Sequence, residues 1–243
     1  AGTQKIEDVL TKEFDGIKIL RMDIDTVRKK GAHEKILTQF SQGKADILLG
    51  TQMIAKGLDF DNVTLVGVIN ADLGLFFPDF RAGERVFQLI YQVAGRAGRR
   101  KIPGHVIVQT YNPQDVYIQA ASTLNTKKFY NISMAQRQEL SYPPFSRIGR
   151  IVFSGKNKNK VSLIASKTYE KLTNHKNYKI LGPAPAPLEK INNMWRLHII
   201  IKIQKDKKRN IYQFIEEKIG LSIIERSWIG VHIQIDVDPI SMM

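Results

Sequence analysis

The sequence of 243 residues contains no cysteine and no apolar run of the roughly 18 residues that a membrane-spanning helix needs. Without cysteine the chain has neither disulfides nor thiolate metal ligands, a composition that suits the cytosol. The first residues lack the layout of a signal peptide, and the five histidines are scattered along the chain. We therefore expect a cytoplasmic protein that has no membrane partner and no metal ligands of its own.

Two nucleotide-binding motifs are also absent. The sequence has no G-x-x-x-x-G-K-[ST] phosphate loop and no D-E-x-H segment that would hold magnesium and orient water. The chain by itself is therefore not expected to form a complete site for ATP hydrolysis.

Acidic residues are scarce in the second half of the chain. Residues 1–122 contain 16 Lys and Arg and 14 Asp and Glu, whereas residues 123–243 contain 21 and 9, and the formal net charge of the whole chain is +14. A basic excess confined to one half points to a polyanion such as nucleic acid as the partner of that half.

Short apolar runs alternate with amphipathic segments in the first half. The runs at 17–22, 45–51, 63–69 and 105–110 predict strands, and the segments at 3–14, 29–42 and 81–95 predict helices, the first of them capped by Thr3. This alternation predicts an α/β domain over 1–122 with a doubly wound parallel sheet. Ligands are expected beyond the C-terminal ends of its strands, where Thr51, Gln52 and Asp72 follow.

The second half predicts a different architecture. Residues 123–145 form a helical connector that ends at Tyr142, Pro143 and Pro144. Over 146–243 we predict strands at 147–155, 195–203 and 228–239, helices at 161–172 and 208–220, and a strand followed by a rigid loop at 178–187. That order is typical of a smaller α+β ferredoxin-like domain, whose four-stranded sheet leaves one face free for a ligand.

Basic residues of this second domain are candidate contacts for DNA phosphates. Two explanations fit the basic segment KDKKR at 205–209, namely a solvated turn and a nucleic-acid contact. The candidates are Arg147, Arg150, Arg196 and Lys202 on strands, and Lys205, Lys207, Lys208 and Arg209 in the basic segment.

Two segments combine glycine with polar side chains, GTQMIAKGLDF at 50–60 and QVAGRAGRR at 92–100. Arg96 and Arg99 are three positions apart, so on a helix both guanidinium groups lie on one face and could clamp a polyphosphate. A helix end with surface arginines is the alternative for the second segment taken alone.

These segments resemble motifs V and VI of superfamily-two helicases. Together with RMDIDTVRKKGA at 21–32 they are similar to the primosomal replication-restart helicases, from about residue 2 to the end of the chain. The resemblance implies the second recA-like helicase lobe, incomplete at its start, followed by a C-terminal domain. It also implies that the phosphate loop and a cysteine-rich zinc segment lie upstream, so that this chain is a C-terminal fragment and zinc is expected only in the upstream segment.

The resemblance assigns Arg99 as the arginine finger that reaches the γ-phosphate of ATP. Arg96 would bind the same phosphates and Gln92 would orient the group. Such a finger stabilises the charge on the transferring phosphoryl group.

The resemblance implies that Gly57, Asp59 and Gly95 approach ATP and its Mg²⁺, and that Thr51 and Gln52 touch the DNA backbone. From the residues alone, Thr26 and the amides near it could offer hydrogen bonds to a DNA phosphate. An equally good explanation is that Thr26 caps a helix.

As a whole, the resemblance implies an ATP-dependent DNA helicase that reloads the replisome at stalled forks in the bacterial cytoplasm. Its expected partners are forked or single-stranded DNA, single-strand-binding protein and other primosome proteins. Two alternatives are the second lobe of another DNA helicase or translocase, and a non-catalytic module that binds nucleic acid or protein.

The segment LGLFFPDF at 73–80 has two explanations. Its phenylalanines could belong to the core, or they could stack on bases or contact another domain.

Overall fold

The computed structural model describes residues 2–23, 26–27, 31–51, 54, 60, 63–95, 104–173, 178–204, 210–220 and 230–242. The chain divides into two compact units. Unit 1 comprises residues 1–75 and 83–126, and unit 2 comprises residues 76–82 and 127–243. The finer division into a lobe over 1–122, a connector over 123–145 and a domain over 146–243 stays a prediction.

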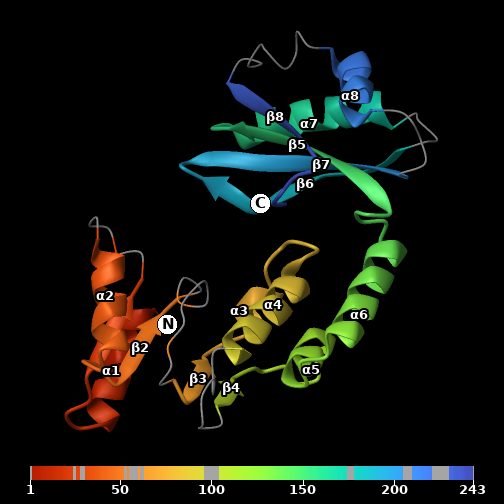
Figure 1. The fold of residues 1–243 in the computed structure, drawn as a ribbon. Coiled ribbons are helices and arrows are strands. Elements are labelled where there is room, and N and C mark those ends of the chain that lie inside the picture. Colours follow the sequence, from red (N-terminus) through yellow and green to blue (C-terminus); the bar gives the residue numbers. More distant parts are fainter. Residues whose placement is uncertain are drawn as a thin grey trace. The chain divides into compact units, whose positions relative to one another are not determined.

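Unit 1 has the predicted mixture of helices and parallel strands (Figure 1). β1 pairs in parallel with β2, and β3 pairs in parallel with β4. Among the described residues these are two separate two-stranded sheets, so a single doubly wound sheet stays a prediction. The elements are α1 (Thr3–Glu13), β1 (Ile19–Met22), α2 (Ala32–Ser41), β2 (Ile47–Gly50), β3 (Leu65–Val68), α3 (Asp72–Leu75), α4 (Ala82–Ala94), β4 (His105–Val108) and α5 (Val116–Ser122).

Unit 2 is built on a four-stranded antiparallel sheet in the order β6-β7-β5-β8. Its elements follow one another in the predicted order: α6 (Thr126–Glu139), β5 (Ser146–Gly155), α7 (Lys158–Leu172), β6 (Tyr178–Ile191), β7 (Met194–Gln204), α8 (Ile211–Ile219) and β8 (Val231–Val237). β6 differs from the prediction, because it continues as strand to Ile191 where a rigid loop was expected.

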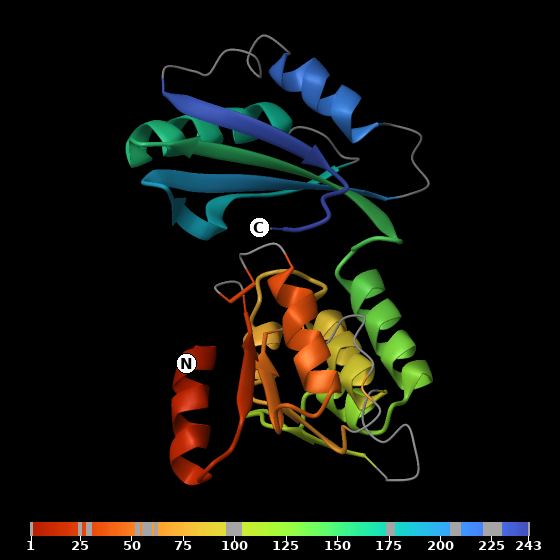
Figure 2. The ribbon, with the colours of Figure 1, turned by 60° about the vertical axis from the view of Figure 1, so that its left-hand side comes forward.

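Helices α7 and α8 cover one face of this sheet (Figures 1 and 2). Side chains alternate along a strand, so every second residue of β7 faces the helices. Ile199, Ile201 and Ile203 on β7 are buried there against Val161 of α7 and Ile215 of α8. Val231, Ile233, Ile235 and Val237 of β8 share this face, since the first two belong to the cluster and the other two pack against it.

The opposite face of the sheet is not free as predicted. Ile148 and Ile200 point away from the helices, and they are buried together with Met242 near the C-terminus. Phe80 and Tyr142 pack against the same cluster. The prediction is wrong for this part of the sheet, because residues from the 76–82 segment, from the connector and from the C-terminal tail cover it.

Candidate nucleotide and DNA site

The ends of β1 and β2 lie side by side, because the two strands are parallel and Met22 pairs with Gly50. A Cβ on Gly50 would collide with the carbonyl oxygen of Met22 and would lie 2.9 Å from Cγ2 of Ile54. Only glycine lets the two backbones approach this closely. Thr51 follows immediately and is exposed, as a site at the strand ends requires, while Gln52, Gly57 and Asp59 lie outside the described residues.

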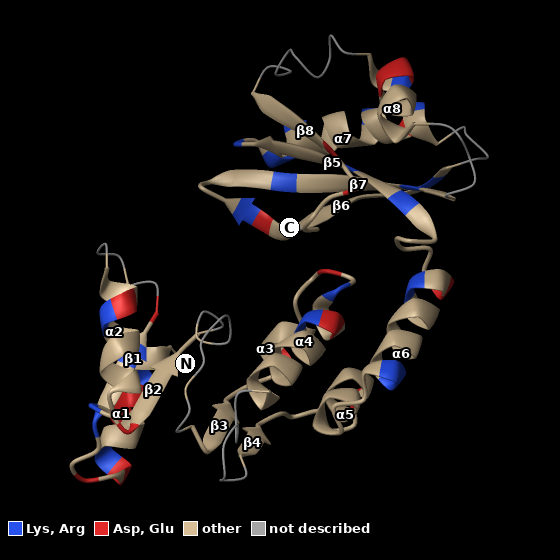
Figure 3. Cartoon of the chain, viewed as in Figure 1, with Lys and Arg blue, Asp and Glu red and all other residues tan. Residues whose placement is uncertain are grey.

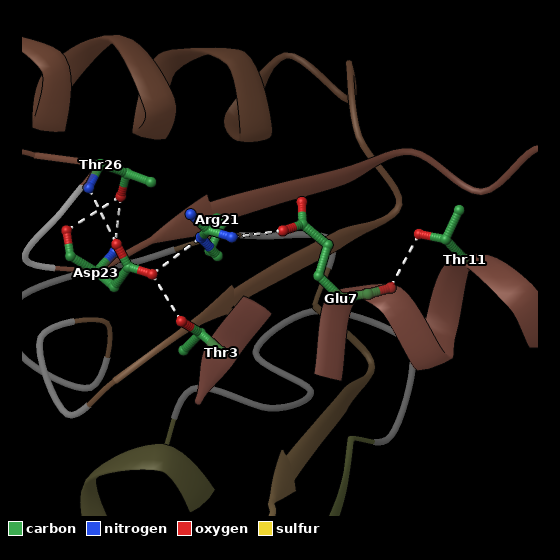
Figure 4. Close-up of polar contacts among 6 residues, drawn as sticks. All are labelled: Thr3, Glu7, Thr11, Arg21, Asp23 and Thr26. Atoms are coloured by element: carbon green, nitrogen blue, oxygen red, sulfur yellow. Dashed lines mark hydrogen bonds and ion pairs between the residues drawn. The ribbon is translucent and has the colours of Figure 1, made fainter. Parts of the chain in front are cut away.

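Asp23 organises the turn after β1 (Figure 4). Its carboxylate accepts hydrogen bonds from Thr3 Oγ1 at 2.6 Å and from the amide of Thr26 at 3.0 Å, and Arg21 Nε lies 2.9 Å away. These hydrogen bonds, the one from Thr3 first, hold the pKa of Asp23 below its usual value. The Thr3 hydroxyl therefore does not cap α1 as predicted, and Gly2 occupies the N-cap position.

Thr26 closes the same turn. Its hydroxyl accepts a hydrogen bond from the amide of Asp23 at 2.8 Å and donates one to the carbonyl of Asp23 at 3.0 Å. The interpretation of Thr26 as a helix cap is wrong, because α2 begins at Ala32 with Gly31 as its N-cap. Both donors of Thr26 are used within the turn, so a contact with a DNA phosphate would require the hydroxyl to rotate away from Asp23.

A further ion pair joins this turn to α1. Arg21 Nη1 lies 2.8 Å from Oε2 of Glu7, whose backbone carbonyl accepts a hydrogen bond from Thr11 within the helix (Figure 4). No pattern in the sequence predicts these contacts, because Glu7 and Arg21 are 14 positions apart and either charge alone is typical of a solvated surface.

Helix α4 leads into the second predicted motif. Val86, Phe87, Ile90 and Val93 are buried along one side of the helix, whereas Gln92 and Gly95 are exposed. The amide of Gly95 still bonds to the carbonyl of Tyr91 at 3.1 Å. Gln92 and Gly95 are thus accessible at the end of a helix, as a nucleotide contact requires, and Arg96 and Arg99 lie outside the described residues.

Asp72, which follows β3, has a structural role. It is buried and accepts hydrogen bonds from Thr110 Oγ1 at 2.8 Å and from the amide of Tyr111 at 2.9 Å. The bond from Tyr111 is the main cause that lowers the pKa of Asp72. Its carboxylate therefore fixes the turn after β4.

Basic residues occur on several strands of unit 2 (Figure 3), but most of the predicted DNA contacts on strands are engaged within the protein. Arg150 is buried, with Nη2 3.6 Å from Asp236 Oδ2. Arg147 is exposed, but its Nη2 lies 2.7 Å from Oδ2 of Asp238. The prediction that Arg150 meets a phosphate is therefore wrong, because the sheet face around it is covered.

Lys202 is also buried, against the prediction. Its Nζ donates a hydrogen bond of 2.8 Å to the carbonyl of Leu140 and lies 3.5 Å from the ring centroid of Tyr142. Burial, with a smaller effect of Lys179, lowers the pKa of Lys202 to about 8. This ammonium group stabilises the end of the connector and is not available to DNA.

Arg196 remains the best placed of the four for DNA. It is partly exposed and makes one long hydrogen bond, of 3.4 Å, to the carbonyl of Leu188. His198 is its neighbour on the same face, and burial, then Arg150 and Arg196, lower the pKa of His198. Nδ1 of His198 has no hydrogen-bond partner in the part of the chain that the structure describes. Lys205, Lys207, Lys208 and Arg209 lie outside that part.

Comparison with known families defines the class of protein. Residues 1–101 match the helicase conserved C-terminal domain, which implies a RecA-like lobe. Residues 138–240 match the primosomal protein N C-terminal domain. The chain thus consists of a helicase lobe followed by a domain typical of primosomal proteins.

The particular relatives are replication restart proteins called PriA. The chain is 45% identical over 245 residues to that of Bacillus subtilis and 41% identical over 247 residues to that of Synechocystis, in both cases across 100% of the chain. It is 37% identical to that of Chlamydia muridarum across 99% of the chain. It corresponds to 30%, 28% and 32% of these proteins, so it spans about a third of their length.

Two further properties bear on the kind of site. No described helix is long and apolar enough to cross a membrane. Among the described residues, no group of three or more His, Asp or Glu side chains could hold a metal ion.

Proposed function

We propose that the chain is the second RecA-like lobe and the C-terminal domain of an ATP-dependent DNA helicase that acts in replication restart. In this proposal unit 1 is part of a doubly wound lobe, and unit 2 contains a ferredoxin-like domain. One observation carries it: the glycine-rich segments similar to motifs V and VI begin where β2 and α4 end, with Thr51, Gln92 and Gly95 exposed.

ATP and Mg²⁺ fit one side of such a site. Bound ATP would supply the phosphoryl group whose transfer to water drives movement along DNA. Gln92 and Gly95 would contact the nucleotide from the end of α4, and Gly57 and Asp59 from motif V. Because the sequence has no D-E-x-H segment that would hold magnesium, we place the ligands of Mg²⁺ in another lobe of the full-length protein.

Arg99 would act on the same phosphates as the arginine finger, with Arg96 beside it. A guanidinium group is planar and permanently charged, so it can hold two phosphate oxygens at once as negative charge develops. Gln92 would orient the phosphate group by hydrogen bonding.

The contacts with DNA would come from both units. Thr51 and Gln52, at the end of β2, would touch the backbone of the strand, and Thr26 would join them once its hydroxyl leaves Asp23. In unit 2 we propose Arg196 with Lys205, Lys207, Lys208 and Arg209. Single-strand-binding protein and other primosome proteins are further proposed partners.

The test is the ATP hydrolysis rate of the full-length protein with saturating forked DNA. Arg99→Ala should lower this rate about a thousandfold while ATP still binds, because the finger acts mainly in the transition state. Arg85→Ala, an exposed arginine earlier on α4, is the matched control and should keep the parental rate. Hydrolysis by Arg99→Ala at nearly the parental rate would exclude Arg99 as the finger.

A second function is favoured for the isolated chain by the basic excess of residues 123–243. The chain alone would be a non-catalytic module that binds DNA without sequence preference through phosphate contacts. Fluorescence anisotropy with labelled single-stranded DNA tests this, and no binding at low salt would contradict it.

A further inference from the structure

The β6–β7 hairpin of unit 2 ends in a tight turn. Ile191 pairs with Met194, so Asn192 and Asn193 alone form the loop. Their φ angles are 48° and 62°, and a two-residue hairpin turn of type I′ needs positive φ at both of these positions. Asparagine tolerates this conformation better than most residues do. The turn therefore holds the start of β7, with Trp195 as its second residue, in a defined position.

Two lysine side chains lie over the indole ring of Trp195, and we call the three residues the tryptophan cluster. Nζ of Lys158, the first residue of α7, is 4.5 Å from the ring centroid, and Nζ of Lys190 on β6 is 4.8 Å from it. Trp195 is partly exposed, and Gly155, the residue opposite it on β5, has no side chain that could cover the ring. An aromatic ring that solvent can reach thus lies beside two ammonium groups.

The end of the sheet that carries this cluster is basic. The described residues that meet there are 154–160, 188–196 and 230–232. Their cationic side chains are those of Lys156, Lys158, Lys160, Lys190 and Arg196. Glu189 is the only acidic residue among them, and Figure 3 shows basic residues on β7 and at the end of β6. This end of the sheet therefore complements a polyanion.

We propose that the tryptophan cluster binds an unpaired base of single-stranded DNA, with the lysines on the adjacent phosphates. An unpaired base can stack on the indole whatever its identity, because every base has an aromatic face. A base within a duplex is already stacked on its neighbours and cannot reach the ring. The inference rests on the proposed function, because it assumes that unit 2 contacts DNA, and it adds a preference for single strands over duplex DNA.

Packing alone does not account for the two lysines. A tryptophan opposite a glycine can have a purely structural role, because its ring covers the gap that Gly155 leaves. Such a ring needs no cation beside it. Lys158 has a carboxylate partner in Glu189, at 2.9 Å, whereas Lys190 has no ion pair within the part of the chain that the structure describes. Like charges at one ring repel each other, and a phosphate beside the ring would neutralise them.

The first experiment follows the fluorescence of Trp195 in the 243-residue chain. Trp228→Phe removes the other tryptophan of the sequence, so that the emission comes from Trp195 alone. A base stacked on an indole quenches its emission, so oligothymidylate at low salt should quench it. A duplex of the same length and poly-glutamate, which has the charge but no bases, should cause little quenching.

The second experiment measures affinity by the anisotropy of labelled DNA. Trp195→Leu should lower the affinity for oligothymidylate about tenfold, within the range typical of stacking on one aromatic side chain, and should leave the affinity for duplex DNA unchanged. Trp195→Phe keeps an aromatic face and should recover most of the loss. Tyr130→Leu, which replaces an exposed aromatic residue on α6 of the same unit, is the matched control and should bind like the parental chain.

An oligonucleotide with abasic sites keeps the phosphates and removes the bases. The parental chain should bind it about as weakly as Trp195→Leu binds oligothymidylate, and Trp195→Leu should lose nothing further.

The lysines are tested through the salt dependence. Lys190→Met should reduce the slope of log affinity for oligothymidylate against log salt by about 0.7, the value for one phosphate contact with a single strand. Lys167→Met, which replaces an exposed lysine farther along α7, should leave the slope unchanged.

Unchanged affinity of Trp195→Leu for oligothymidylate, or an equal loss for duplex DNA in the folded variant, would overturn the inference. So would equal quenching by poly-glutamate and oligothymidylate, since charge alone would then explain binding. If circular dichroism shows that Trp195→Leu does not fold, the quenching in Trp228→Phe and the abasic comparison in the parental chain decide. A parental chain that binds neither single-stranded nor duplex DNA at low salt would instead contradict the DNA contacts of the proposed function.

Discussion

The burial of Lys202 predicts an unusual pH dependence for the stability of unit 2. The ammonium group is buried, bonded to the carbonyl of Leu140 and close to the ring of Tyr142, and its pKa is lowered to about 8. In the unfolded chain a lysine titrates near pH 10.4. Between these two values the unfolded state binds more protons than the folded state, so the free energy of unfolding must rise with pH.

The magnitude follows from the two pKa values. Between pH 7 and pH 9.5, relief of the buried charge should raise the free energy of unfolding by about 2 kcal/mol. Lys202→Met has no group that titrates at this position, so it should lack this increase. The difference between the parental protein and Lys202→Met should therefore grow by about 2 kcal/mol in favour of the parental protein over this range.

Urea unfolding followed by tryptophan fluorescence is the assay. The two tryptophans of the sequence are at positions 195 and 228, within the residues of unit 2, so the transition reports on that unit. Lys167→Met, which replaces an exposed lysine on α7, is the control for removal of a positive charge. The free energy of unfolding of the parental protein is compared with that of each variant. If the difference for Lys202→Met changes as little with pH as the difference for Lys167→Met, the assignment of Lys202 as a buried ammonium group is refuted.

Four further outcomes are expected. Gly50→Ala should lower the free energy of unfolding of unit 1 by about 1–3 kcal/mol, because the added Cβ would collide with the carbonyl oxygen of Met22. Thermal unfolding followed by circular dichroism measures this change. Gly67→Ala is the control, because no atom lies within 4 Å of a Cβ at that position. The isolated chain should show no magnesium-dependent ATP hydrolysis after repurification. In the full-length protein Arg96→Ala should slow hydrolysis, but less than loss of the finger does. Arg196→Ala should reduce the slope of log affinity for DNA against log salt by about 0.7–0.9, and an unchanged slope would remove Arg196 from the interface.

Local patterns predicted most of the elements, because hydrophobic periodicity depends on residues close in sequence. The helix expected at 81–95 is observed at Ala82–Ala94, and the strand expected at 195–203 is observed at Met194–Gln204. β6 was underestimated because its prolines suggested a loop. It lies at the edge of the sheet, where a residue without an amide hydrogen is tolerated, and it shifts register on either side of Pro185. The position of β6 at the edge follows from the order of strands in the sheet, which a single sequence does not show.

The placement of the candidate site residues was predictable only where it follows from their position along a strand or helix. The exposed Thr51 after β2 and the exposed Gln92 on α4 were expected from the motifs. The role of Thr26 was not expected from the sequence. Its amide donates a hydrogen bond to the carboxylate of Asp23, which also accepts one from Thr3 of α1. Contacts between residues 20 positions apart leave no pattern in a single sequence.

Burial also determines which basic side chains of unit 2 are accessible to a partner. Arg150 and Lys202 contribute to the formal excess, yet both are buried within the unit. Their partners show why: Lys202 contacts Leu140 and Tyr142 of the connector, which covers part of the sheet, and Arg150 pairs with Asp236 on the neighbouring strand β8. If unit 2 binds DNA as proposed, the contacts must come from other residues of the unit, and the partly exposed Arg196 is a candidate. The excess of Lys and Arg in the sequence predicts the class of partner, whereas only the fold shows which of these side chains are exposed enough to contact that partner.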